Sequence, residues 1–372
     1  MNEQSKIEIT PELLEQNPLL AVALSATSLL VMLLLVGSLA SWVYLIVRAW
    51  RGQPWLVVEP SAPRVWGLAD LVVIAVLTVA CQIFFASAYA RLTGFQMPPE
   101  ETGSMPAAIG AAASAGNIMA VLLSAAWIIL RFGVSIGHVG FRGSGLVRQL
   151  QIAVISVLAV LPIVYLLMAA VSIGLKTDYK HPLLDEIRTT ATLTSYLLGV
   201  FTAVLMAPLA EEFLFRGIIQ GWLQSWGRSS PSEILLGASL PQRFSSDAII
   251  TANLVGETSS PPSLFPVEPP EFNTGEGHAS LVMDDRLIEQ VEGEPFVTTP
   301  PWWPAVVTGI LFGLAHWGYG LSFIPLIVLG IVLGLLYRAT HSLWPCIAVH
   351  MVLNGTSMLG LGLGILIERA KL

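Results

Sequence analysis

Long apolar stretches separated by short polar segments dominate the chain. Eight stretches approach the roughly 20 residues that a helix needs to cross a bilayer. They lie near residues 19–47, 66–90, 107–130, 152–175, 191–226, 303–319, 321–338 and 342–367. The stretch at 303–319 is short and runs into the sequence HWGYG. The pattern predicts an all-α fold, a polytopic membrane bundle of about eight transmembrane helices.

The stretch at 191–226 is too long for one simple span, because 36 residues of helix extend about 54 Å at 1.5 Å per residue. We expect either that its first part lies outside the membrane or that Pro208 breaks the helix.

The composition supports this class of protein. The chain has 372 residues, of which 54% are hydrophobic and 12% are charged, whereas soluble domains average about 25% charged residues. An integral membrane protein follows. No basic block indicates nucleic-acid binding, so we expect no nucleic-acid partner. Two cysteines, Cys81 and Cys346, fall in apolar stretches and are expected to be core residues.

Charged loops give the orientation. The loops at 48–65 and 131–151 each carry three arginines, which favours a cytosolic position for both and an N-terminus outside. The loop at 176–190, with two lysines and an arginine, argues the other way.

Residues 227–301 are rich in Pro, Ser, Gly and acidic residues, which predicts a disordered or loosely folded loop, with a small folded insert as the alternative.

The segment APLAEEFLFRG, residues 207–217, brings charges into an apolar stretch. Glu212 and Arg216 are four residues apart and share a helix face, while Glu211 points elsewhere. Charges inside membrane spans usually face a partner or a cavity. We therefore expect Arg216 to hold Glu212 and to leave Glu211 available for chemistry.

Two later apolar stretches repeat this four-residue spacing. His316 follows Phe312, and Asn354 follows His350. Each residue alone has a structural reading: a membrane histidine or asparagine often bridges helices, and a Glu–Arg pair can be structural. Three stretches that bring polar groups to one depth instead favour a functional site.

These motifs, EExxxR, FxxxH and HxxxN in this order, resemble those of the CPBP (Abi, CAAX-protease) family of intramembrane endopeptidases, related to type II CAAX prenyl endopeptidases. The resemblance covers about 152–226 and 302–365. It implies a CPBP protease core at 151–372, with the polar loop 227–301 inserted, preceded by N-terminal accessory transmembrane helices at 1–150. Bacterial members imply the inner (plasma) membrane.

The resemblance, with the chemistry of amide hydrolysis, implies a role for each residue. Glu211 would activate the attacking water as general base, and His316 would help hold that water. His350 and Asn354 would donate hydrogen bonds to the oxyanion, and Glu212 with Arg216 would orient the helix. The expected partners are the lipid bilayer and a membrane-associated protein or peptide substrate. Cleavage is expected near the C-terminus of a prenylated or membrane-bound substrate.

Alternatives remain for the metal and for the function. Glu211, His316 and His350 match a catalytic zinc set, but the chain has no HExxH, and we expect no metal or other cofactor. The alternative functions are a catalytically silent scaffold or bacteriocin-immunity protein, and a transporter whose buried charges line a path.

Overall fold

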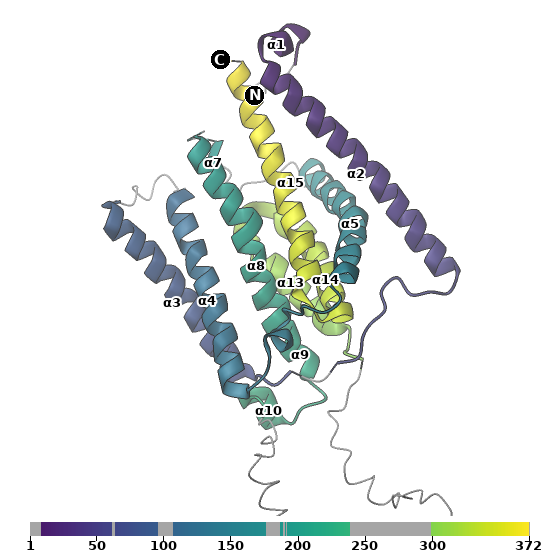
Figure 1. Ribbon diagram of the computed structural model, residues 1–372, viewed down its shortest axis with the longest axis vertical. Coiled ribbons are helices and arrows are strands. Elements are labelled where there is room, and N and C mark those ends of the chain that lie inside the picture. The colour runs from purple at the N-terminus through teal and green to yellow at the C-terminus, as the bar shows by residue number, and fades with distance from the viewer. Residues whose placement is uncertain are drawn as a thin grey trace, which may run out of the picture. The chain divides into compact units, whose positions relative to one another are not determined.

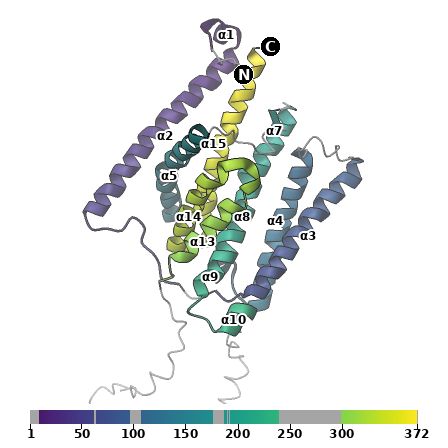
Figure 2. The ribbon, with the colours of Figure 1, turned by 180° about the vertical axis from the view of Figure 1, so that it is seen from behind.

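The computed structural model describes residues 9–61, 64–95, 107–175, 187–188, 190, 192–238 and 299–371, and in these ranges it contains helices and no strands (Figures 1 and 2). Among the described residues, seven helices are long and apolar enough to cross a membrane. The all-α polytopic bundle is thereby confirmed. The seven are α2 (Pro18–Trp50), α3 (Leu68–Thr93), α4 (Ala107–Phe132), α5 (Leu146–Leu175), Leu193–Ser225, Gly320–Thr340 and α15 (Leu343–Ala370).

The eighth predicted stretch forms the short helix α13 (Trp303–Leu314). Its 12 residues extend only about 18 Å, well short of a bilayer core. A tight helical turn, η5 (Trp317–Ser322), joins α13 to α14 (Phe323–Thr340), and α13 and α14 pack against each other. Of two smaller helices, α1 (Pro11–Gln16) precedes α2, and η2 (Ile136–Val139) lies between α4 and α5.

The helix Leu193–Ser225 is continuous, so of the two alternatives for this stretch the break at Pro208 is absent. It comprises α7 (Leu193–Val200), the π-helical turn η3 (Phe201–Met206), α8 (Ala207–Glu212), the π-helical turn η4 (Phe213–Gln220) and α9 (Gly221–Ser225). Pro208 is the second residue of α8, which follows η3 directly. A π-turn changes the carbonyl that each N–H reaches, so the helix passes the proline without kinking at the usual clash.

Glycines allow α13 and α14 to approach closely. A Cβ on Gly330 would lie 2.8 Å from the Cα of Gly309, and one on Gly334 would lie 2.8 Å from the Cα of Ala305. Such stripes of small residues let helix backbones pack in a membrane, where no hydrophobic force drives association. In an apolar 18-residue window of the span Gly320–Thr340, 44% of the residues are buried, against 6% in α2 and in α3, so α14 lies in the interior of the bundle.

Helices α3 and α4 form a pair on one flank of the Leu193–Ser225 helix, and α5 and α2 lie on the other (Figures 1 and 2). Asp70, fully buried, fixes the start of α3. It accepts from the backbone N–H of Gly67 at 3.0 Å and from Trp127 of α4 at 2.9 Å, and it pairs with Arg131 of α4 at 2.9 Å.

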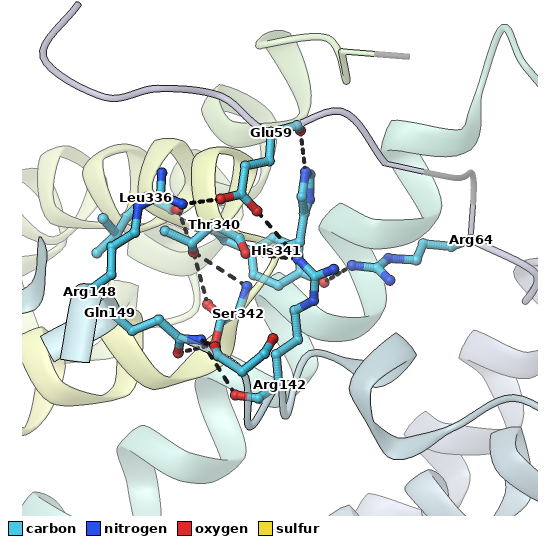
Figure 3. A network of polar contacts seen from close by, with 11 residues as sticks. Glu59, Arg64, Arg142, Arg148, Gln149, Leu336, Thr340, His341 and Ser342 are labelled. Atoms are coloured by element: carbon cyan, nitrogen blue, oxygen red, sulfur yellow. Dashed lines mark hydrogen bonds and ion pairs between the residues drawn. The ribbon is translucent and has the colours of Figure 1, made fainter. Parts of the chain in front are cut away.

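A polar network fixes the turn between α14 and α15 (Figure 3). The carboxylate of Glu59 pairs with Arg148 and lies 3.7 Å from Arg142. The ring of His341 donates from Nε2 to the Glu59 carbonyl at 2.6 Å. On the same turn, Ser342 donates to the side chain of Gln149 at 2.7 Å. The chain before α3 is thus bound to the start of α15, two turns before His350.

The polar stretch at 227–301 begins with a short helix, α10 (Pro231–Leu236), capped by Ser230 and Glu233. Arg131 at the end of α4 donates to the carbonyl of Leu236 at 2.8 Å. The remainder, 239–298, lies outside the described residues, so the predicted loop stays a prediction there.

Candidate active site

Glu212 and Arg216 form a fully buried ion pair. Nε of Arg216 lies 3.1 Å from Oε2 of Glu212, and both side chains have 0% exposure. The contact has ion-pair distance without the alignment of a hydrogen bond. This is the pair that the four-residue spacing indicates, because i and i+4 side chains meet on one helix face.

Arg216 also anchors its helix to α14. Its Nη2 donates to the carbonyl of Gly330 at 3.1 Å, and Gln220, one turn later, donates to the carbonyl of Gly334 at 2.7 Å. Thr308 of α13 donates to the other side of the Gln220 amide at 3.2 Å. Sequence reasoning missed Gln220, although it extends the Glu212–Arg216 face by four residues. The three-helix contact positions Glu211 and Glu212.

His350 of α15 connects the two glutamates. Its Nδ1 lies 2.9 Å from Oε1 of Glu212, and its Nε2 lies 3.8 Å from Oε2 of Glu211. Because a carboxylate accepts, Nδ1 carries the hydrogen in the first contact when Glu212 is ionised. This carboxylate fixes the ring, and Nε2 faces Glu211, an arrangement in which a third group orients a catalytic histidine.

Phe312, fully buried, is the centre of the aromatic contacts. The guanidinium of Arg216 lies 4.6 Å from the Phe312 ring centroid, a cation–π contact. The rings of His316 and His350 lie 5.1 and 5.5 Å from it. His316 follows the end of α13, and its Nδ1 donates to the Phe312 carbonyl at 2.8 Å. Phe312 thus joins all three motifs.

Glu211 differs from Glu212 in its surroundings. Its side chain is 30% exposed, whereas that of Glu212 is 0% exposed. Its Oε2 atom is buried, and no hydrogen-bond partner for it occurs in the described part of the chain. Glu211 lines a cavity of about 200 Å³ between α3, α4 and its own helix. It is therefore the carboxylate of the pair that a substrate or water can approach.

Asn354 makes a contact that the sequence did not predict. Its side-chain NH₂ donates to the carbonyl of Ala203 in η3 at 2.8 Å. In this π-turn the N–H of Ala207 bonds to Thr202, five residues back. Pro208 has no N–H for the next carbonyl, that of Ala203, and Asn354 replaces it. One of the two N–H groups of Asn354 remains for another acceptor.

The fit to a metal ion can be tested on the donor set. No group of three His, Cys, Asp or Glu side chains in the described ranges is arranged to hold a metal ion. Nδ1 of His350 is directed to Glu212, and Nδ1 of His316 is directed to a carbonyl. Histidines that bind zinc commonly donate their other ring N–H to such an oxygen, so zinc at Glu211, His316 and His350 stays the alternative to a metal-free reaction.

The three motifs meet in space, and the chemical roles of their residues stay predictions. Glu211, Glu212, Arg216 and His350 are joined by ionic contacts, and His316 reaches them through Phe312. Asn354 contacts the backbone of the helix that carries Glu211, about two turns before that residue.

Comparison with known proteins supplies one match. Residues 193–241 and 287–356 match a family model described as type II CAAX prenyl endopeptidase Rce1-like. These segments contain all three motifs and cover about a third of the chain. No curated protein and no solved structure matches.

Proposed function

We propose that this chain, a member of the CPBP (CAAX-protease) family through its type II CAAX prenyl endopeptidase Rce1-like segments, is an intramembrane endopeptidase. Its proposed general base is Glu211. The observation that carries the proposal is Oε2 of Glu211, which makes no hydrogen bond in the described chain, lies 3.8 Å from Nε2 of His350 and belongs to a side chain that borders a cavity. The proposed protease core is 151–372.

The proposed reaction is direct hydrolysis of a peptide bond. Glu211 takes a proton from a water molecule, whose oxygen attacks the carbonyl carbon of the substrate. The carbonyl oxygen becomes an oxyanion and accepts hydrogen bonds from Nε2–H of His350, which in this step is protonated on both ring nitrogens, and from the second N–H of Asn354. The C–N bond then breaks, and Glu211 returns the proton to the leaving amine. The products are a carboxylic acid and an amine.

The remaining residues act as positioning groups. Glu212 holds the His350 ring through Nδ1, while Arg216 holds Glu212 and the carbonyl of Gly330. His316, oriented by the Phe312 carbonyl, is proposed to help hold the water. Side chains held in place in this way need little rearrangement as charge develops in the transition state.

The substrate is a membrane-bound protein. Cleavage near its C-terminus, with or without a prenyl group, is the finer proposal, and the bacterial inner membrane with an external N-terminus is the proposed location. We infer that 227–301 then lies on the cytosolic side. No metal or other cofactor enters the proposed mechanism.

The test compares protein termini in membranes of cells that carry either the wild type or Glu211→Gln, at matched expression. The expected result is a set of new termini that occurs with the wild type and is lost in the variant. Identical termini in the two membranes would contradict the proposal and favour a catalytically silent scaffold. Equal thermal stability of the two proteins is the control that the variant is folded.

A further inference from the structure

The cavity beside Glu211 has polar walls formed by helices outside the family match. It has a volume of about 200 Å³. That is room for several waters or one residue-sized group, since a water occupies about 30 Å³ in the liquid. Its polar lining residues are Thr78 and Gln82 of α3, Asn117 and Ser124 of α4, and Glu211. The family model begins at residue 193, so four of these five lie outside it.

The spacing of these residues places the polar side chains of each helix on one face. Thr78 and Gln82 are four residues apart on α3, and Asn117 and Ser124 are seven apart on α4. Each pair therefore forms a stripe along one helix face. Polar side chains in membrane spans usually face the bundle interior or a water-filled cavity. Both stripes face the same cavity as the proposed general base.

Two polar atoms of residues at this cavity make no hydrogen bond within the described ranges. The hydroxyl of Ser124, in a side chain with 0% exposure, makes no hydrogen bond, and neither does Oε2 of Glu211. Such a group costs about 1–3 kcal/mol when it is buried without a partner. Both residues line the cavity, so a bound polar group can satisfy them.

The amides of Gln82 and Asn117 hydrogen-bond to each other across the helix pair. Gly116 permits this contact, because a Cβ there would lie 2.6 Å from the carbonyl oxygen of Cys81. The bond uses one N–H and one carbonyl. The amide that donates keeps its carbonyl, and both amides keep at least one N–H group, whichever way the two amides are turned. An acceptor beside a donor complements the backbone N–H and C=O of a peptide unit.

We propose that this cavity is a substrate chamber, which binds the peptide chain of the substrate next to the scissile bond. The Gln82–Asn117 pair hydrogen-bonds the backbone of the peptide, and the same peptide segment supplies a hydrogen-bond partner for Ser124. The proposal rests on the proposed endopeptidase function and adds a specificity site to it. Helices α3 and α4 then form one wall of the active site, which goes beyond an accessory role for residues 1–150.

The first arm of the test measures cleavage by the full-length protein in lipid nanodiscs. The probe is a fluorogenic peptide with a farnesylated C-terminal Cys-a-a-X sequence. Gln82→Leu and Asn117→Leu are each expected to raise KM about 3- to 10-fold, the value of one hydrogen bond, with kcat within twofold. Ser87→Leu, at an exposed position of α3 outside the chamber, is the matched control and keeps both constants. Unchanged KM in both folded chamber variants overturns the proposal. Asn117→Ala replaces Asn117→Leu if the larger side chain prevents folding.

The second arm does not depend on cleavage. In protein with Cys81→Ala and Cys346→Ala, the Ser124→Cys thiol is treated with 2-aminoethyl methanethiosulfonate. We expect it to react at least 10-fold faster than a Ser87→Cys thiol, because a hydrated chamber allows the thiolate to form. An equal or slower rate of modification overturns the proposal of a hydrated chamber, whether or not the protein is a protease. If the wild type does not cleave the probe while the Ser124→Cys thiol is reactive, only the proposed function is contradicted.

Discussion

Nδ1 of His350 lies 2.9 Å from Oε1 of Glu212, the carboxylate whose other oxygen lies 3.1 Å from Arg216. Glu212 thus connects the arginine of its own helix to the histidine of α15, and it turns Nε2 of that histidine toward Glu211. The second glutamate of the motif therefore has two partners, and the first faces the cavity.

Replacing Glu212 by Gln should reduce stability as well as activity. The change leaves Arg216 as an uncompensated charge with 0% exposure, which typically costs about 3–5 kcal/mol. Thermal unfolding in detergent measures this loss. Glu211→Gln is the matched control: it should keep the unfolding temperature and lose cleavage by roughly 10²- to 10⁴-fold, the usual size of general acid–base catalysis. Equal stability of both variants would show that Arg216 does not depend on Glu212.

Asn354 has a structural and a proposed chemical role, and a double-mutant cycle separates them. Asn354→Ala removes the donor to the Ala203 carbonyl and should reduce stability by about 1–2 kcal/mol. Pro208→Ala supplies a backbone N–H, so in that background the same change should cost less. Cleavage should be lost in both backgrounds if Asn354 also binds the oxyanion. Recovery of activity together with stability would limit Asn354 to its contact with Ala203.

Gly330→Ala should separate α13 from α14. The new methyl group would lie 2.8 Å from the backbone of Gly309, and overpacking of this kind costs roughly 1–3 kcal/mol. The shift also moves the carbonyl that holds Arg216, so cleavage should fall. Gly360→Ala on α15, where nothing lies within 4 Å of the new Cβ, is the control. It should be neutral or stabilising by up to about 1 kcal/mol, because Ala has the higher helix propensity.

Stability should fall in acid because of His341, which lies between two membrane spans. Burial lowers the pKa of His341 from 6.5 to about 4, and the nearby Arg64 and Arg142 act in the same direction against the Glu59 carbonyl. The folded state binds fewer protons than the unfolded state between these values. The free energy of unfolding should therefore be constant above pH 6.5 and fall by about 3 kcal/mol as the pH drops to 4.

Unfolding temperatures measured across pH 7.5 to 4 check this prediction. His341→Asn is the comparison variant, because Asn does not titrate and tolerates the left-handed backbone of this position, with φ of 50°. The variant should show a smaller acid dependence. The same slope in both proteins would assign the acid sensitivity to other groups.

Chelators should leave cleavage unchanged. Glu211, His316 and His350 do not form a metal-binding group in the described chain, and the proposed mechanism uses none. The measurement is activity after incubation with 1,10-phenanthroline, together with the zinc content of the purified protein. A zinc-to-protein ratio near one, with activity lost on chelation and restored by zinc, would contradict this prediction.

Local regularities determined much of the protein from the sequence. Apolar length gave the membrane-spanning helices, because every span must satisfy its backbone internally. Helical periodicity gave the Glu212–Arg216 pair, because residues four apart share a face. It also gave the Phe312–His316 contact. The order of the three motifs was enough to indicate the family.

Tertiary structure decided what depends on distant residues. His350 and Glu212 are 138 positions apart, so no local pattern predicts that one holds the other. Of the two alternatives for the long stretch, the break at Pro208 is absent because Asn354, from another helix, bonds to the carbonyl that the proline leaves. The polar stripes of α3 and α4 are visible in the sequence, but only their packing beside Glu211 gives them a common cavity. Spacing along a helix fixes which side chains share a face, whereas the packing of helices fixes which faces meet.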